Sequence, residues 1–177
     1  VMVEPNPLWE EILSDEIETP DELKQALKKH RIDITGMYSF FISEIRTVSK
    51  DLPIILGGLV WSDPQWWDLM EKQNDPFCVY DVHNYEPRDF THPMEADETG
   101  GSYSAEYPGT YWCMAADDTV LYNKALLENV IFKKVREFQK KHNVPILLGE
   151  FGMQLPQHGG LIYLDDHAAI ARKYGWH

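Results

Sequence analysis

The chain has 177 residues, of which 44% are hydrophobic and 12% aromatic, so it can form one domain with a sizeable core and is not a disordered segment. Its formal net charge is −13 and its Lys and Arg residues form no long basic run, which argues against a nucleic-acid or anionic-membrane surface. No stretch reaches the roughly 18 consecutive apolar residues of a membrane span. We therefore expect no nucleic-acid partner and no membrane insertion, and a neutral ligand is the best candidate.

The first elements in chain order are the end of a strand and two helices. Residues 1–3 resemble the tail of a strand rather than its start. A surface helix begins at "TPDE", where Thr19 can cap, Pro20 suits the first helical position and Glu22 completes a capping box. Residues 34–49 follow with apolar side chains at helical spacing, which predicts a second helix with one buried face. The residues of this face are Tyr38, Phe41, Ile42, Ile45 and Val48.

Three apolar runs have the length and flanks of buried parallel strands: residues 53–61, 77–85 and 144–152. A long helical pattern over 117–143 precedes the last of them. Residues 86–118, rich in Gly, Pro and aromatic residues, are predicted to form a long loop, and loops of that length are usually either functional or disordered. Alternating strands and helices predict an α/β architecture, either doubly wound or a barrel.

Polar and aromatic residues follow these strands where each strand ends. They are Glu4, Trp61, His83, Tyr85 and Glu150. In a barrel the carboxyl ends of the strands build the active face, and residues two apart share a side, so these groups are expected to converge. Two carboxylates with flat aromatic rings suit glycosidic bond cleavage, which needs an acid, a second carboxylate and surfaces that stack on sugars.

Four segments in order, "VMVEPNP", "YDVHNYEPRDFTHP", "VPILLGEFG" and "DDHAAIARKYGWH", resemble the later half of a family 5 glycoside hydrolase, the cellulase and mannanase type of (β/α)8 barrel. The resemblance implies that residues 1–177 are a fragment of a single catalytic barrel domain, a partial (β/α)8 TIM barrel with strands four to seven. It also implies a β-linked polysaccharide or oligosaccharide as substrate and the missing half of the barrel as a partner.

The resemblance also implies roles for individual residues. Glu4 would be the acid/base and Glu150 the nucleophile of a retaining mechanism, while His83 and Tyr85 would contact the sugar and the nucleophile. Trp61 would be a stacking platform. One departure is Val3, which stands where the family usually has an asparagine that binds the sugar 2-hydroxyl. The aromatic residues of 86–118 are either packed within the loop or part of outer subsites, and Trp112 is the one taken as substrate-binding.

The function that the resemblance implies is that of a retaining endo-β-1,4-glucanase, with a β-mannanase as the close alternative. It would be extracellular, because its substrate is a polymer, and would need no cofactor or metal. A metal-dependent hydrolase using Asp81, His83 and His92 is a competing hypothesis without a convincing ligand set. A non-catalytic carbohydrate-binding fragment is another, although such a groove would not need two carboxylates.

Overall fold

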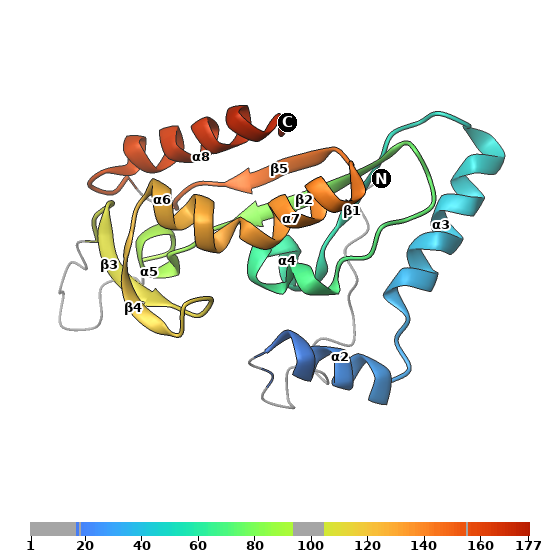
Figure 1. Cartoon of the computed structure of the whole chain (residues 1–177), viewed down its shortest axis with the longest axis horizontal. Coiled ribbons are helices and arrows are strands. Elements are labelled where there is room, and N and C mark those ends of the chain that lie inside the picture. Colours follow the sequence, from blue (N-terminus) through green and yellow to red (C-terminus); the bar gives the residue numbers. More distant parts are fainter. Residues whose placement is uncertain (1–16, 18, 94–104, 155) are drawn as a thin grey trace.

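A computed structural model describes residues 17, 19–93, 105–154 and 156–177, and its centre is a parallel sheet (Figure 1). The three strands are β1 (Ile54–Gly57), β2 (Cys78–Asn84) and β5 (Ile146–Phe151), in the order β1-β2-β5. Each lies within one of the three apolar runs, so the predicted strands are confirmed. The sheet does not close into a barrel within the part of the chain that the structure describes, and the predicted α/β class with a partial barrel is confirmed.

Helices connect the strands and cover the sheet. The longest are α3 (Ile34–Val48) and α8 (Gly160–Tyr174). The shorter ones are α2 (Pro20–Lys29), α4 (Leu59–Ser62), the 3₁₀ helix η1 (Pro64–Leu69), α5 (Arg88–Thr91), α6 (Lys124–Leu126), the π-helical turn η2 (Leu127–Ile131) and α7 (Lys133–His142). The predicted capping box at the start of α2 is present, with Glu22 and Thr19 satisfying each other's backbone N–H groups.

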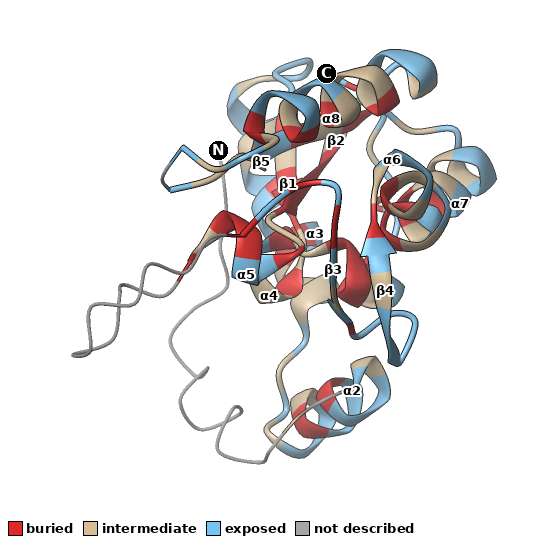
Figure 2. Ribbon diagram, turned by 90° about the vertical axis from the view of Figure 1, so that its left-hand side faces the viewer, coloured by how far each residue is buried: buried red, intermediate tan, exposed pale blue. Residues whose placement is uncertain are grey.

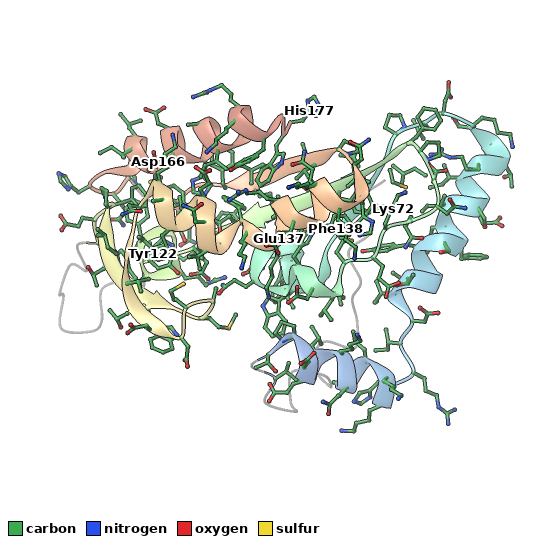
Figure 3. All side chains as sticks on the ribbon, in the orientation of Figure 1. Lys72, Tyr122, Glu137, Phe138, Asp166 and His177 are labelled. Carbon is green, nitrogen blue, oxygen red and sulfur yellow. The ribbon has the colours of Figure 1, made fainter. Side chains whose placement is uncertain are left out.

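The two faces of the sheet differ in how well they are covered. On the helix-covered face the strand residues are buried, namely Ile54, Leu56, Cys78, Tyr80, Ile146 and Leu148. Phe138 of α7 packs on this face, its ring 5.1 Å from that of Tyr80 (Figure 3). The alternate residues Ile55, Val79 and Leu147 on the other face are only partly buried. The face that carries Ile55, Val79 and Leu147 corresponds to the inside of the barrel.

A register shift interrupts the pairing of β2 with β5. Val82 pairs with Leu148, but the next residue, His83, pairs with Glu150 rather than with Gly149. Two residues of β5 therefore oppose one of β2, as in a β-bulge. Strict alternation from Leu148 would turn Glu150 to the helix-covered face, and the bulge turns it to the face of His83 instead.

The prediction for residues 86–118 as a connection without regular structure is wrong in part. The segment contains α5 and the antiparallel hairpin of β3 (Gly109–Cys113) and β4 (Asp118–Tyr122). The helix predicted over 117–143 accordingly begins later than expected. Thr119, Val120 and Tyr122 favour a strand, and Asn123 caps α6 by accepting a hydrogen bond of 3.0 Å from the Leu126 N–H.

The predicted buried face of the second helix is only partly correct. Tyr38 and Ile42 are buried, whereas Phe41 and Val48 are exposed. Figure 1 shows α3 at one end of the molecule, away from the centre of the sheet. The buried core lies between the sheet and helices α7 and α8, and β2 is almost wholly buried (Figure 2).

Candidate active site

The site lies at the carboxyl ends of β2 and β5, which point toward α5 and the β3–β4 hairpin (Figure 1). The Tyr85 hydroxyl donates a hydrogen bond of 3.1 Å to Oε2 of Glu150. Nδ1 of His83 lies 3.5 Å from the same oxygen. The Glu150 side chain is 47% exposed, so its carboxylate is held by two neighbours and still reaches solvent. The structure thus brings together three of the residues singled out in the sequence.

A fourth residue, Asp81, lies behind His83 on the same side of β2. Its Oδ2 is 2.8 Å from Nε2 of His83, and both side chains are almost completely buried. Because a carboxylate oxygen only accepts hydrogen bonds, Nε2 carries a proton, and this N–H donates a hydrogen bond to Asp81. The histidine is therefore not a core histidine satisfied by backbone groups. It lies between the carboxylates of Asp81 and Glu150.

Tyr85 contacts residues of the α5 segment in addition to Glu150. Its carbonyl oxygen accepts a hydrogen bond from the Thr91 hydroxyl at the end of α5, and its ring packs edge-on against His92, with 5.0 Å between the ring centroids. The pKa of Tyr85 is raised, first by burial and then by its hydrogen bond to Glu150 and by the charge of that group. The phenol therefore stays protonated and remains a donor to the carboxylate.

Trp61 and Trp112 are placed differently. Trp61 is 63% exposed in α4, where Val60, Trp61 and Ser62 adopt left-handed backbone angles that cost roughly 1–2 kcal/mol per residue. Trp112 is 58% exposed on β3. Of the other aromatic residues of 86–118, Tyr107 is buried and packs against Phe90. Trp66 and Trp67 of η1 are also buried. Tyr103 lies outside the described residues.

Glu4, the predicted acid/base, also lies outside the described residues. The role of Glu4 stays a prediction. Within the described residues no group of three or more His, Cys, Asp or Glu side chains could hold a metal ion. The competing hypothesis of a metal site used Asp81, His83 and His92. Asp81 contacts His83, whereas Nδ1 of His92 lies 2.9 Å from the Thr91 hydroxyl, so these two hydrogen bonds do not join the three side chains into one group.

Two acidic residues near this edge were not identified from the sequence. Glu86 follows Tyr85 directly, and burial, with a smaller contribution from the charge of Asp63, raises its pKa to about 7. The pKa of Asp63 is raised by burial to about 6. Their raised pKa values come from tertiary burial, and the only sequence signal was the position of both residues shortly after apolar runs.

A sheet of this kind, with a solvent-reaching carboxylate held at its carboxyl edge, defines part of an α/β barrel with a candidate hydrolytic site. A family model described as cellulase (glycosyl hydrolase family 5) matches residues 8–174. The chain therefore belongs to glycoside hydrolase family 5, and the predicted resemblance is confirmed.

Known relatives agree with this family. Endoglucanase H of Acetivibrio thermocellus is 24% identical over 120 residues, a match that covers 68% of this chain and 11% of that protein. A hyperthermophilic endo-β-1,4-glucanase solved in complex with substrate superposes with a TM-score of 0.63 at 24% identity, covering 89% of this chain and 45% of that one.

Cel5A of Thermotoga maritima provides two further structures with the same fold. One, with mannotriose, has a TM-score of 0.54 at 22% identity over 89% of this chain and 44% of that chain. The other, with cellobiose, has a TM-score of 0.57 at 22% identity over 76% and 42%. This chain spans less than half the length of each of these relatives. No helix among its described residues is long and apolar enough to cross a bilayer.

Proposed function

We propose that the protein is a retaining endo-β-1,4-glycanase that cleaves β-1,4-glucan, with Glu150 as nucleophile and Glu4 as acid/base. The observation that carries the proposal is the placement of Glu150. Its half-exposed carboxylate ends a strand of a family 5 chain and has the Tyr85 hydroxyl at 3.1 Å and the His83 ring at 3.5 Å. A nucleophilic carboxylate must be fixed in direction and still reach the anomeric carbon, and this arrangement allows both.

The reaction would proceed in two displacements. In the first, a Glu150 oxygen attacks the anomeric carbon, the bond to the leaving oxygen breaks, and Glu4 gives that oxygen a proton. In the second, Glu4 takes a proton from water, the water attacks the same carbon, and the bond to Glu150 breaks. The configuration of the sugar is then retained. Tyr85 would keep one Glu150 oxygen occupied and so direct the other toward the sugar.

The two glutamates are tested by replacing each with alanine. Glu150→Ala should abolish turnover of every glycoside, because no covalent intermediate can form. Glu4→Ala should spare the first displacement of substrates with good leaving groups and slow the second, where Glu4 acts as base. Azide, which needs no base, should restore Glu4→Ala with retained configuration. If it restores Glu150→Ala at all, the product should be inverted.

Glu137→Ala is the matched control, because Glu137 is an exposed carboxylate on α7 whose Oε1 lies 4.0 Å from Nζ of Lys133. It should leave turnover unchanged. An inverted product from Glu4→Ala with azide and a retained one from Glu150→Ala would mean that Glu4 is the nucleophile and Glu150 the acid/base. If both variants were folded and neither changed turnover, the two-glutamate mechanism would be wrong. In a structure that includes Glu4, the two carboxyl groups should be about 5 to 5.5 Å apart.

A β-mannanase activity is the second candidate. It is supported by Cel5A, whose fold this chain shares and which has been solved with both mannotriose and cellobiose. Glucose and mannose differ in configuration at one hydroxyl, and no described contact of this chain distinguishes them. Comparing kcat/KM for cellotetraose and mannotetraose tests the choice. Binding of both without cleavage would favour the non-catalytic carbohydrate binder instead.

We further propose that residues 1–177 belong to a single catalytic barrel that other strands complete. The partly buried side chains of Ile55, Val79 and Leu147 on the inner face support this, because a closed barrel would bury them. A stable, active monomer made of these 177 residues alone, observed by light scattering, would contradict it. The polymeric substrate favours a secreted protein, and detection of the enzyme in culture medium would test that.

A further inference from the structure

Asp81 is a buried charge that the two-glutamate mechanism does not use. It is 2% exposed and lies in the middle of β2, paired with Gly57 on one side and Leu147 on the other. Burying a carboxylate costs several kcal/mol unless it is paired and hydrogen-bonded. Asp81 therefore needs a partner that offsets the cost of burying its charge.

One oxygen of Asp81 faces His83 and the other faces the bulge. Oδ2 lies 2.8 Å from Nε2 of His83. Oδ1 has no hydrogen-bond partner in the described part of the chain and lies against Gly149, where an added Cβ would come within 2.2 Å of it. Asp81 thus touches the residue that directly precedes Glu150, and it touches the histidine that faces Glu150.

The two ring nitrogens of His83 have different carboxylates as neighbours. Nε2 meets Asp81, and Nδ1 lies 3.5 Å from Oε2 of Glu150. A neutral histidine would have a proton on one nitrogen only and would turn the lone pair of the other toward a carboxylate, which is repulsive. With a proton on each nitrogen, both contacts are attractive, and the buried charge of Asp81 is balanced.

We propose that Asp81 is a positioning residue, which holds the His83 ring protonated on both nitrogens and turned so that Nδ1–H faces the nucleophile Glu150. The carboxylate of Asp81 is buried behind the ring, so it acts on Glu150 through His83 and through Gly149. The role in catalysis rests on the proposed function, whereas the protonation of His83 can be measured without any substrate.

The first test is the protonation of the His83 ring, followed by ¹⁵N NMR at neutral pH in the complete protein. Both nitrogens should be protonated in the unaltered protein. In Asp81→Asn the carboxylate beside Nε2 is removed and the one beside Nδ1 remains, so the ring should be singly protonated on Nδ1. In Glu150→Gln the carboxylate beside Nδ1 is removed and the one beside Nε2 remains, so the ring should be singly protonated on Nε2. Two variants are thus expected to produce opposite tautomers.

Glu150→Gln changes an accessible side chain and keeps the test available if Asp81→Asn does not fold. Asp166→Asn is the matched control, because Asp166 is a carboxylate of α8 that accepts a hydrogen bond of 2.8 Å from Tyr107 and is not bonded to His83. It should leave the His83 signals unchanged. A singly protonated ring in the unaltered protein, or the Nδ1–H tautomer in Glu150→Gln, would overturn the proposal.

The second test is kinetic. Asp81→Asn should lower kcat by about 10- to 100-fold, the size expected when a hydrogen bond to a charged group is weakened. KM should stay the same, because Asp81 is buried and does not touch substrate. An unchanged kcat in an active enzyme would overturn the positioning role. If the unaltered protein cleaved no glycoside, the proposed function would fail instead, and the NMR result would still decide the protonation of His83.

Discussion

Two buried histidines lie in different surroundings, one at the carboxyl edge of the sheet and one under α8. His83 at the edge has the carboxylates of Asp81 and Glu150 as neighbours. His167 of α8 has no such neighbour among its described hydrogen bonds. Its Nδ1 donates to the carbonyl oxygen of Tyr163 at 2.8 Å.

The remaining contacts of His167 are those of a core residue. Its Nε2 accepts a hydrogen bond of 2.8 Å from the side-chain amide of Asn84, and its ring is stacked on Phe151 at 5.2 Å. Both nitrogens are satisfied with a single proton, and burial lowers the pKa of His167 to about 4. The comparison teaches that burial does not distinguish a structural histidine from a functional one, whereas the charge of its hydrogen-bond partners does.

The largest expected effect comes from replacing each of the two histidines by alanine and comparing activity with stability. His83→Ala should lower kcat/KM by about 10²- to 10³-fold, comparable to the loss of one donor to a reacting group, and should also lower the free energy of unfolding, because Asp81 is left buried without its partner. His167→Ala should leave kcat/KM close to that of the unaltered enzyme and lower the free energy of unfolding by about 3 kcal/mol, because it leaves a cavity and an unpaired Asn84 amide. Enzyme kinetics and urea denaturation measure the two. A large loss of kcat/KM in a stable His167→Ala enzyme would break the distinction.

A second prediction concerns the pH dependence of stability. The unfolded state binds a proton at His167 near its ordinary pKa of about 6.5, but the folded state does so only near 4. Its contribution is therefore present above pH 6.5 and is lost as pH falls toward 4, by about 3 kcal/mol in total. The difference in unfolding free energy between the unaltered protein and His167→Gln, measured by urea denaturation across this range, isolates the effect.

Glu86 provides a control for that titration, because its pKa is shifted so that its contribution to stability changes with pH in the opposite direction. Its folded-state pKa is raised to about 7 from an ordinary value of 4.5, so its contribution is present below pH 4.5 and is lost as pH rises to 7. The difference curve for Glu86→Gln should slope in the opposite sense to that for His167→Gln. Parallel curves would contradict the burial of one of the two groups.

The smallest expected effect concerns the two exposed tryptophans, Trp61 and Trp112. If Trp112 forms an outer subsite, Trp112→Ala should weaken cleavage of long oligosaccharides by a factor of about 5 to 10, an aromatic stacking contact of roughly 1 kcal/mol, and should spare a short aryl glycoside. Trp61→Ala should weaken cleavage of both, because Trp61 follows a strand of the sheet. Equal losses on both substrates for Trp112→Ala would mean that Trp112 acts through the fold of the hairpin.

Much of the fold was predictable because its signals are local. The apolar runs of the three strands, the capping box of α2 and the spacing of Leu127, Ile131, Val135 and Phe138 report burial directly, and these four side chains are buried. The β3–β4 hairpin was missed because its strands are short and only half-buried, so β3 was read as part of the connection over 86–118 and β4 as the start of a helix. Val48 shares the apolar spacing of α3 but is 91% exposed, which depends on the tertiary placement of that helix.

The sequence by itself determined which groups reach the site edge, since Tyr85 and Glu150 end their strands wherever those strands are placed. Only the tertiary structure decided that they meet. Simple alternation does not reveal the bulge at Gly149, which turns Glu150 to the face of His83 because Asp81 of the neighbouring strand occupies the space where a Gly149 side chain would lie. Register and close packing between strands far apart in the chain are non-local, and so no short stretch of sequence encodes them.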